Sequence, residues 1–157
     1  MKTAVLAMLL TATTPTGTAP GATLRDLVRD IALQYPRTEL AACGKAYPVQ
    51  DAAFAAALAG FGSRIDGILE AMVPEQPALT MPLPPAFGAF QAMQSALAAE
   101  DFRTRSPADC EAVVRELEAL TDTELKAGMM ESAVRLEQTI RSHNAEMERV
   151  MGIEPTS

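Results

Sequence analysis

The sequence predicts an all-α protein, a small bundle of about four to five helices that follows an N-terminal signal segment. Hydrophobic residues make up 48% of the 157 and are mainly Ala, Leu and Met, with no Trp, two Tyr and five Phe. This composition favours helix over sheet. Apolar side chains recur at spacings of three and four along several stretches, which is the periodicity of amphipathic helices. The two cysteines add one predicted disulfide, and the length fits a single domain.

Residues 1–22 have the features of a secretory signal peptide. Lys2 precedes ten mostly apolar residues, and a run rich in Thr, Pro and Gly follows. The apolar stretch is too short to span a bilayer, which takes about 20 residues. We therefore predict cleavage near Gly21 or Ala22, a mature helical domain of residues 23–157, and a periplasmic or secreted location. The alternative is that the first residues form the first helix of a cytosolic domain.

Cys43 and Cys110 are the only cysteines of the chain. An even number of cysteines in an exported protein predicts a disulfide. The two lie too far apart in the sequence for a CxxC redox or metal motif. In a cytosolic protein the same residues would be ordinary buried thiols.

The first helix is predicted to begin at Thr23, which with Asp26 has the spacing of a capping box. Pro36 is predicted to stop this helix, because a proline inside a helix removes one backbone hydrogen bond. A short helical turn over residues 38–43 is then expected to end at Gly44 in a left-handed C-cap.

A second helix is predicted from Pro48 to Met72 as a buried core helix, because its apolar run is too short to span a membrane. Its large side chains are spaced 4, 3, 4, 3 and 4 residues apart, as in a heptad seam. They are Phe54, Leu58, Phe61, Ile65, Ile68 and Met72. Small residues beside this seam are expected to let another backbone approach closely, and they are Ala53, Ala57, Gly60 and Gly67.

Residues 73–85 carry five prolines and are predicted to form an extended connector. Helix is expected to resume over residues 86–99.

Another helix is predicted to start at Ser106-Pro107, where an N-cap serine precedes a proline at the first helical position. Thr121-x-x-Glu124 forms a further capping box, where the apolar seam also changes phase.

The last helix has a seam of three heptads and is expected to end at Gly152 and Pro155. The inward positions are Met129, Ala133, Leu136, Ile140, His143, Met147 and Val150. We expect this seam and that of the second helix to bury each other in an antiparallel bundle. That arrangement favours a monomer. A homodimer would form if the connector held the last helix away from the other helices, because the apolar seam of that helix would then be exposed.

His143, Met147 and Met151 share one face of the last helix at positions i, i+4 and i+8. Imidazole and thioether ligands suit Cu(I), so these residues are weak candidates for a soft-metal site. Methionine is also a routine filler of cores, and a single histidine is usually structural. The sequence therefore favours no metal site, and no cofactor is expected.

The charge of the chain excludes some classes of partner. The formal net charge is −7, and 11 acidic residues against five basic ones lie from Asp109 onward. Such a surface repels phosphate backbones and anionic lipid, so we expect neither a nucleic-acid partner nor peripheral membrane binding. No membrane span is expected after signal removal, because the apolar runs are short.

Recognisable catalytic motifs, such as GxSxG, HExxH or a Walker loop, are absent from the sequence. The expected function is that of a non-enzymatic exported binding or interaction protein, with an unidentified protein or small ligand as its partner. The alternatives are a copper-handling envelope protein and an enzyme whose acids converge only in the folded chain.

Overall fold

The computed structural model describes residues 21–84, 87 and 105–152, and within them it confirms an all-α fold with a disulfide. The elements are α1 (Leu24–Ala46), the 3₁₀ turn η1 (Pro48–Gln50), α2 (Asp51–Met72), the 3₁₀ turn η2 (Pro77–Thr80), α4 (Pro107–Ala119) and α5 (Asp122–Met151). The predicted signal segment up to residue 20 lies outside the described residues. So does the helix predicted over residues 86–99, except for Phe87.

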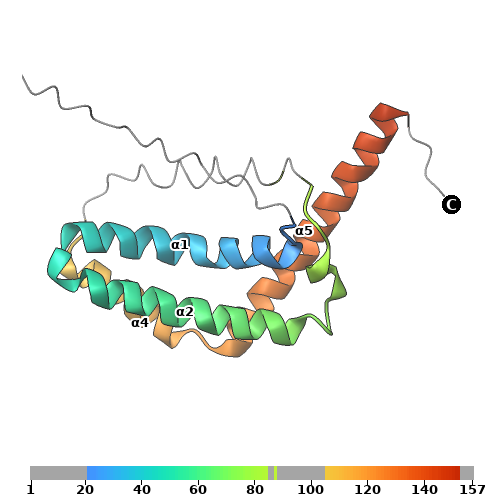
Figure 1. Ribbon diagram of the computed structural model, residues 1–157. Helices are drawn as coiled ribbons and strands as arrows, with labels where there is room; N and C mark the ends of the chain where they lie inside the picture. The colour runs from blue at the N-terminus through green and yellow to red at the C-terminus, as the bar shows by residue number, and fades with distance from the viewer. Residues whose placement is uncertain (1–20, 85–86, 88–104, 153–157) are drawn as a thin grey trace, which may run out of the picture.

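Helices α1 and α2 lie side by side and run in opposite directions (Figure 1). At the closed end of this hairpin, Gly44 of α1 meets the Asp51 side chain, and a Cβ at Gly44 would clash with the Asp51 carboxylate. At the other end, Arg29 is paired with Asp66. Helices α4 and α5 both contact the hairpin, and the last turns of α5 extend past the other helices (Figure 1).

Helix α1 runs through Pro36, so the predicted stop at this residue is wrong. Leu33 and Leu40, on either side of the proline, are both buried, and Leu33 lies against Gly62 of α2. This packing offsets the lost backbone hydrogen bond, since tertiary contacts override local propensity. The predicted left-handed cap at Gly44 is wrong as well, because α1 ends at Ala46 and Gly44 has no positive φ.

Helix α2 buries the seam predicted for it only in part. Phe54, Phe61, Ile65 and Met72 are buried, whereas Leu58 and Ile68 are half-buried, and Leu69, which was outside the predicted seam, is fully buried. The shift from Ile68 to Leu69 follows the 3.6-residue period of a straight helix, which departs from a strict heptad.

Of the small residues predicted to let another backbone approach α2, Ala57 is half-buried and packs against the core, whereas the other three do not form a close contact. Ala53, Gly60 and Gly67 are exposed, and no described atom comes within 4 Å of a Cβ placed at either glycine. Among the described residues, Gly62 is the α2 glycine that faces α1. The prediction that the apolar run of Pro48–Met72 is too short to cross a membrane is not supported, because by length and composition alone this helix is long and apolar enough. Its most apolar 18-residue window has a mean hydropathy of 1.3, and 28% of that window is buried, so α2 is a buried core helix only in part.

The Pro-rich connector is only partly extended. Residues 77–80 form η2, in which Pro77 occupies the first position and Leu79 is fully buried. Beyond this turn the chain is extended and pairs with the start of α1, where the N–H of Leu24 donates to the Met81 carbonyl at 2.8 Å. The connector therefore fixes the start of α1.

Both predicted capping boxes are confirmed. Thr23 and Asp26 open α1, and Thr121 and Glu124 open α5. Ser106 is the N-cap of α4, as predicted. Gly152 ends α5 in the left-handed conformation, with φ of 68°.

The seam of α5 is buried at Met129, Ala133 and Ile140, but the side chains of Met147 and Val150 are 42% and 71% exposed. The expectation that the whole seam is buried is thus wrong, because α5 is longer than the helices that cover it (Figure 1).

The ion pair between Arg29 and Asp66 predicts a loss of stability in acid. Hydrogen bonding to Arg29 holds the pKa of Asp66 below its ordinary value. Its contribution is therefore complete above the unfolded pKa of about 3.9 and is lost as the pH falls through the lower folded value. Both side chains are more than a third exposed, so the loss is expected to stay within about 1 kcal/mol. Urea unfolding at pH 2 to 6 measures the free energy of unfolding as a function of pH. We expect this free energy to change less with pH in Asp66→Asn than in the unmodified protein, and an equal change in both would contradict this assignment.

Candidate functional site

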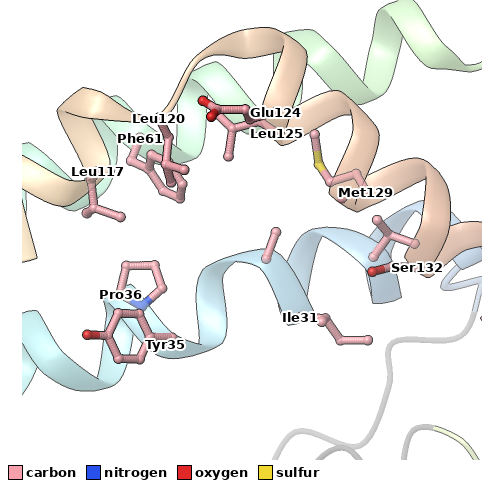
Figure 2. A pocket seen from close by; sticks show the side chains of 13 residues that line it. Ile31, Tyr35, Pro36, Phe61, Leu117, Leu120, Glu124, Leu125, Met129 and Ser132 are labelled. Atoms are coloured by element: carbon pink, nitrogen blue, oxygen red, sulfur yellow. The ribbon is translucent and has the colours of Figure 1, made fainter.

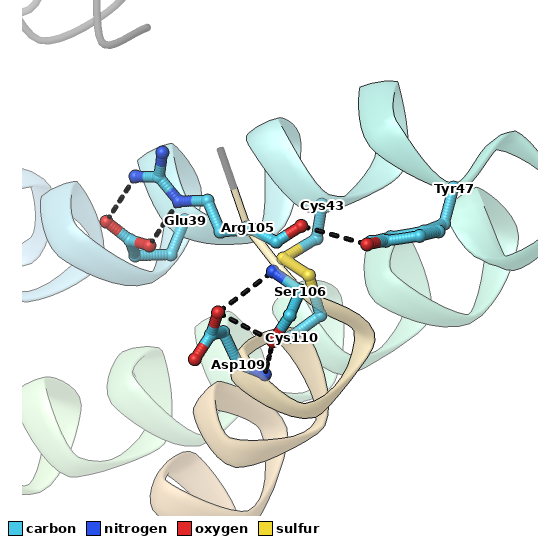
Figure 3. Close-up of a disulfide and its surroundings, with 7 residues drawn as sticks. All are labelled: Glu39, Cys43, Tyr47, Arg105, Ser106, Asp109 and Cys110. Atoms are coloured by element: carbon cyan, nitrogen blue, oxygen red, sulfur yellow. Dashed lines mark hydrogen bonds and ion pairs between the residues drawn. A yellow bond between two sulfur atoms is a disulfide. The ribbon is translucent and has the colours of Figure 1, made fainter. Parts of the chain in front are cut away.

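The predicted disulfide is present and links α1 to the first turn of α4. The Sγ atoms of Cys43 and Cys110 are bonded, and the Cα atoms lie 5.7 Å apart (Figure 3). Both residues are fully buried. A buried disulfide without a free cysteine in the chain is typical of a structural crosslink, not of a redox site.

Beside the disulfide, Glu39, Tyr47 and Arg105 form a set of polar contacts that we call the clasp (Figure 3). The Arg105 guanidinium donates to both carboxylate oxygens of Glu39, at 2.8 and 2.9 Å, and the Tyr47 hydroxyl donates to the Arg105 carbonyl at 2.8 Å. The side chains of Arg105 and Glu39 are only 6% and 11% exposed. The clasp and the disulfide together hold the start of α4 against α1.

An apolar groove of about 330 Å³ lies between α1 and the junction of α4 with α5 (Figure 2). Val28, Phe61, Leu117 and Met129, all buried, form part of its wall. The groove has further lining from Ile31, Ala32, Tyr35, Pro36, Leu120, Glu124, Leu125, Gly128 and Ser132. Helices far apart in the sequence therefore combine to form one apolar hollow.

The α1 side of the groove is open to solvent. Ile31 and Tyr35 are 41% and 55% exposed and lie one helical turn apart (Figure 2). On the α5 side, Gly128 contributes no side chain to the groove. A Cβ at this position would have no described atom of another segment within 4 Å, so there is open space beside it.

Among the described residues, Glu124 is the one ionisable carboxyl or amine group that lines the groove. Its Oε2 accepts hydrogen bonds from the Thr121 backbone N–H at 2.8 Å and from the Thr121 hydroxyl at 2.7 Å. These bonds lower the pKa of Glu124, so the carboxylate is charged at neutral pH.

A second hollow of about 260 Å³ lies on the other side of Phe61 and Leu117, between α2 and α4. Arg64 lines it, but its guanidinium is bonded to Asp122 and to the carbonyls of Leu117 and Leu120. Arg64 therefore caps the end of α4 and ties it to α2, and we assign this hollow a structural role.

The weak metal candidates of α5 do not form a common site. The His143 ring is half-buried and packs edge-on against Phe87, with 5.8 Å between ring centroids. Met147 and Met151 are exposed. His143 and Met151 are eight residues apart, or about 12 Å along a helix, which is too far for both to ligate one ion. No group of three or more His, Cys, Asp or Glu suited to a metal occurs in the described part of the chain.

The acids give no sign of catalysis in the described ranges. Glu39 is the buried carboxylate among these residues, and Arg105 neutralises it. General acid–base chemistry needs acids that converge on a cleft where a substrate can bind.

The groove was not predicted from the sequence. The change of seam phase at Thr121 and the lone glycine in the following helix, Gly128, were the available signals. No protein family, curated protein sequence or solved structure matches this chain, so its function is inferred from its own residues.

Proposed function

We propose that this chain is an exported, non-enzymatic binding protein that holds the apolar part of a partner in the groove between α1 and the α4–α5 junction. The observation that carries the proposal is a preformed apolar hollow whose rim exposes two large side chains, Ile31 and Tyr35. Its volume lies within the range of about 300–1,000 Å³ that is usual for ligand pockets.

The groove is held open by rigid neighbours. Cys43 and Cys110 fix α4 to α1, and Arg64 fixes the α4–α5 junction to α2. A groove held in its binding-competent shape loses less conformational entropy when a partner binds. This rigidity supports binding as the role of the groove.

Export is the second part of the proposal. The disulfide is compatible with an oxidising compartment. The predicted cleavage near Gly21 or Ala22 would leave the whole of α1 intact, together with its capping box of Thr23 and Asp26. A secreted or periplasmic chain would thus keep every contact of α1 described above.

A variant that fills the groove tests the proposal. Gly128→Leu places an apolar side chain in the hollow, removes no packing, and should raise helix stability by up to about 1 kcal/mol. With the uncharged fluorophore N-phenyl-1-naphthylamine as probe, we expect saturable binding at one site on the oxidised protein. The Kd should rise at least tenfold in Gly128→Leu.

The matched control is Gly67→Leu, at an exposed glycine on the outer face of α2. This variant makes the same chemical change outside the groove and should bind the probe as the unmodified protein does. The same loss of binding in both variants, or no saturable binding to the unmodified protein, would contradict the proposal.

A further inference from the structure

The groove has the electrostatics of a site for a cation. Glu124 lies in its lining, and in the part of the chain that the structure describes no Lys or Arg does. The chain carries a net charge of −7, and 11 acidic residues against five basic ones lie from Asp109 onward, the part of the chain that contributes the α4–α5 side of the groove. A carboxylate, sulfate or phosphate next to the groove would therefore be repelled, and a Lys or Arg would be attracted.

The shape of the exposed apolar surface favours a polypeptide over a small molecule. Ile31 and Tyr35 lie four residues apart on α1, so the apolar rim extends for about 6 Å along the helix. An occupant that filled only the hollow would leave these rim side chains in water. A helix with apolar side chains at positions i, i+3 or i+4, and i+7 covers such an elongated surface.

We infer that the occupant of the groove is a cationic amphipathic segment of another protein, whose large apolar side chains enter the hollow while a neighbouring Lys or Arg faces Glu124. The inference rests on the proposed function, because it names the class of partner for the same groove. The polar atoms of the site suit this role, since Glu124 Oε2 is held by Thr121 and its carboxylate is already placed at the rim.

Three peptides test the charge preference. They share Leu at i, i+3, i+4 and i+7 and carry Lys, Glu or Gln at the polar positions. Fluorescence anisotropy with the full oxidised protein should show binding of the Lys peptide at least tenfold tighter than that of the Gln peptide, and still weaker binding of the Glu peptide. Raising the salt concentration should reduce the difference in affinity between the Lys peptide and the Gln peptide, because salt screens charges near the surface.

Glu124→Gln removes the charge and keeps the capping box, in which Gln also serves. This variant should reduce the Lys-over-Gln preference at least threefold. Glu116→Gln, which removes one charge from an exposed position outside the groove lining, should leave the preference unchanged. Gly128→Leu should weaken binding of the Lys and Gln peptides alike.

The remaining outcomes separate this inference from the proposed function. Equal binding of the Lys and Gln peptides, lost in Gly128→Leu, overturns the charge preference and leaves the groove as the binding site. Lys-peptide binding that persists in Gly128→Leu shows adhesion to the acidic surface and overturns the inference. Binding of the naphthylamine probe without any peptide assigns the groove to a small ligand. A concentration-dependent dimer in sedimentation that Gly128→Leu dissociates would instead assign it to a second copy of the chain.

Discussion

Replacing both cysteines, in Cys43→Ala with Cys110→Ala, is expected to lower the free energy of unfolding by about 4 kcal/mol. The disulfide spans 67 residues of sequence, and a crosslink over a loop of that length removes much of the conformational entropy of the unfolded chain. Because domains of this size are stable by only about 5–15 kcal/mol, the loss should be visible as a large drop in the urea midpoint.

The control for this experiment is the unmodified protein measured with and without reductant. Reduction removes the crosslink and retains both sulfur atoms, so its effect separates the crosslink from the packing of the side chains. A loss below about 1 kcal/mol in the double variant would show that the disulfide is not a main source of stability.

Breaking the ion pair of the clasp is expected to have an effect of similar size. Arg105→Met removes the guanidinium that donates to both oxygens of Glu39, and the carboxylate then stays in a nearly buried position without this cation. Removing one partner of a buried pair typically costs about 3–5 kcal/mol. Equilibrium unfolding in urea at neutral pH measures the effect.

The double variant Glu39→Leu with Arg105→Met is the internal control. Removing both charges leaves neither member of this buried pair behind, so this variant should be more stable than Arg105→Met alone. The single variant Glu39→Leu completes the cycle. If the loss of stability in the double variant equals the sum of the losses in the two single variants, Glu39 and Arg105 are not coupled.

The features predictable from the sequence are those set by neighbouring residues or by the composition of the whole chain. Ser106 with Pro107 and Thr121 with Glu124 contain all the chemistry of their helix starts, and the structure has both. The disulfide followed from cysteine parity together with the predicted signal segment. Fold class was likewise set by composition and period, which act along the whole chain.

The features that could not be predicted depend on how long each helix stays covered by others. Pro36 does not end α1, because the residues around it pack on both sides. Val150 continues the apolar periodicity of α5 but is exposed, because the last turns of α5 extend past the other helices. The apolar periodicity of a helix predicts which of its faces is buried. It does not predict where along the helix the neighbouring helices end.

The candidate site was missed for the same reason. Ile31, Phe61 and Leu117 each fit an ordinary apolar stripe, and only the crossing of their helices makes them walls of one groove. Arg105 stands in a polar stretch of sequence, and nothing in its neighbours indicates that it is buried with Glu39.

The most direct test of the groove as the binding site is a methyl NMR titration of the oxidised protein with N-phenyl-1-naphthylamine. The ring current of a bound naphthyl group shifts the methyl signals that it contacts. We expect shifts at Ile31, Leu117 and Met129, with the exposed methyl groups of Met147 and Met151 unchanged. Shifts confined to Met147 and Met151, with the groove methyl groups unmoved, would contradict the account.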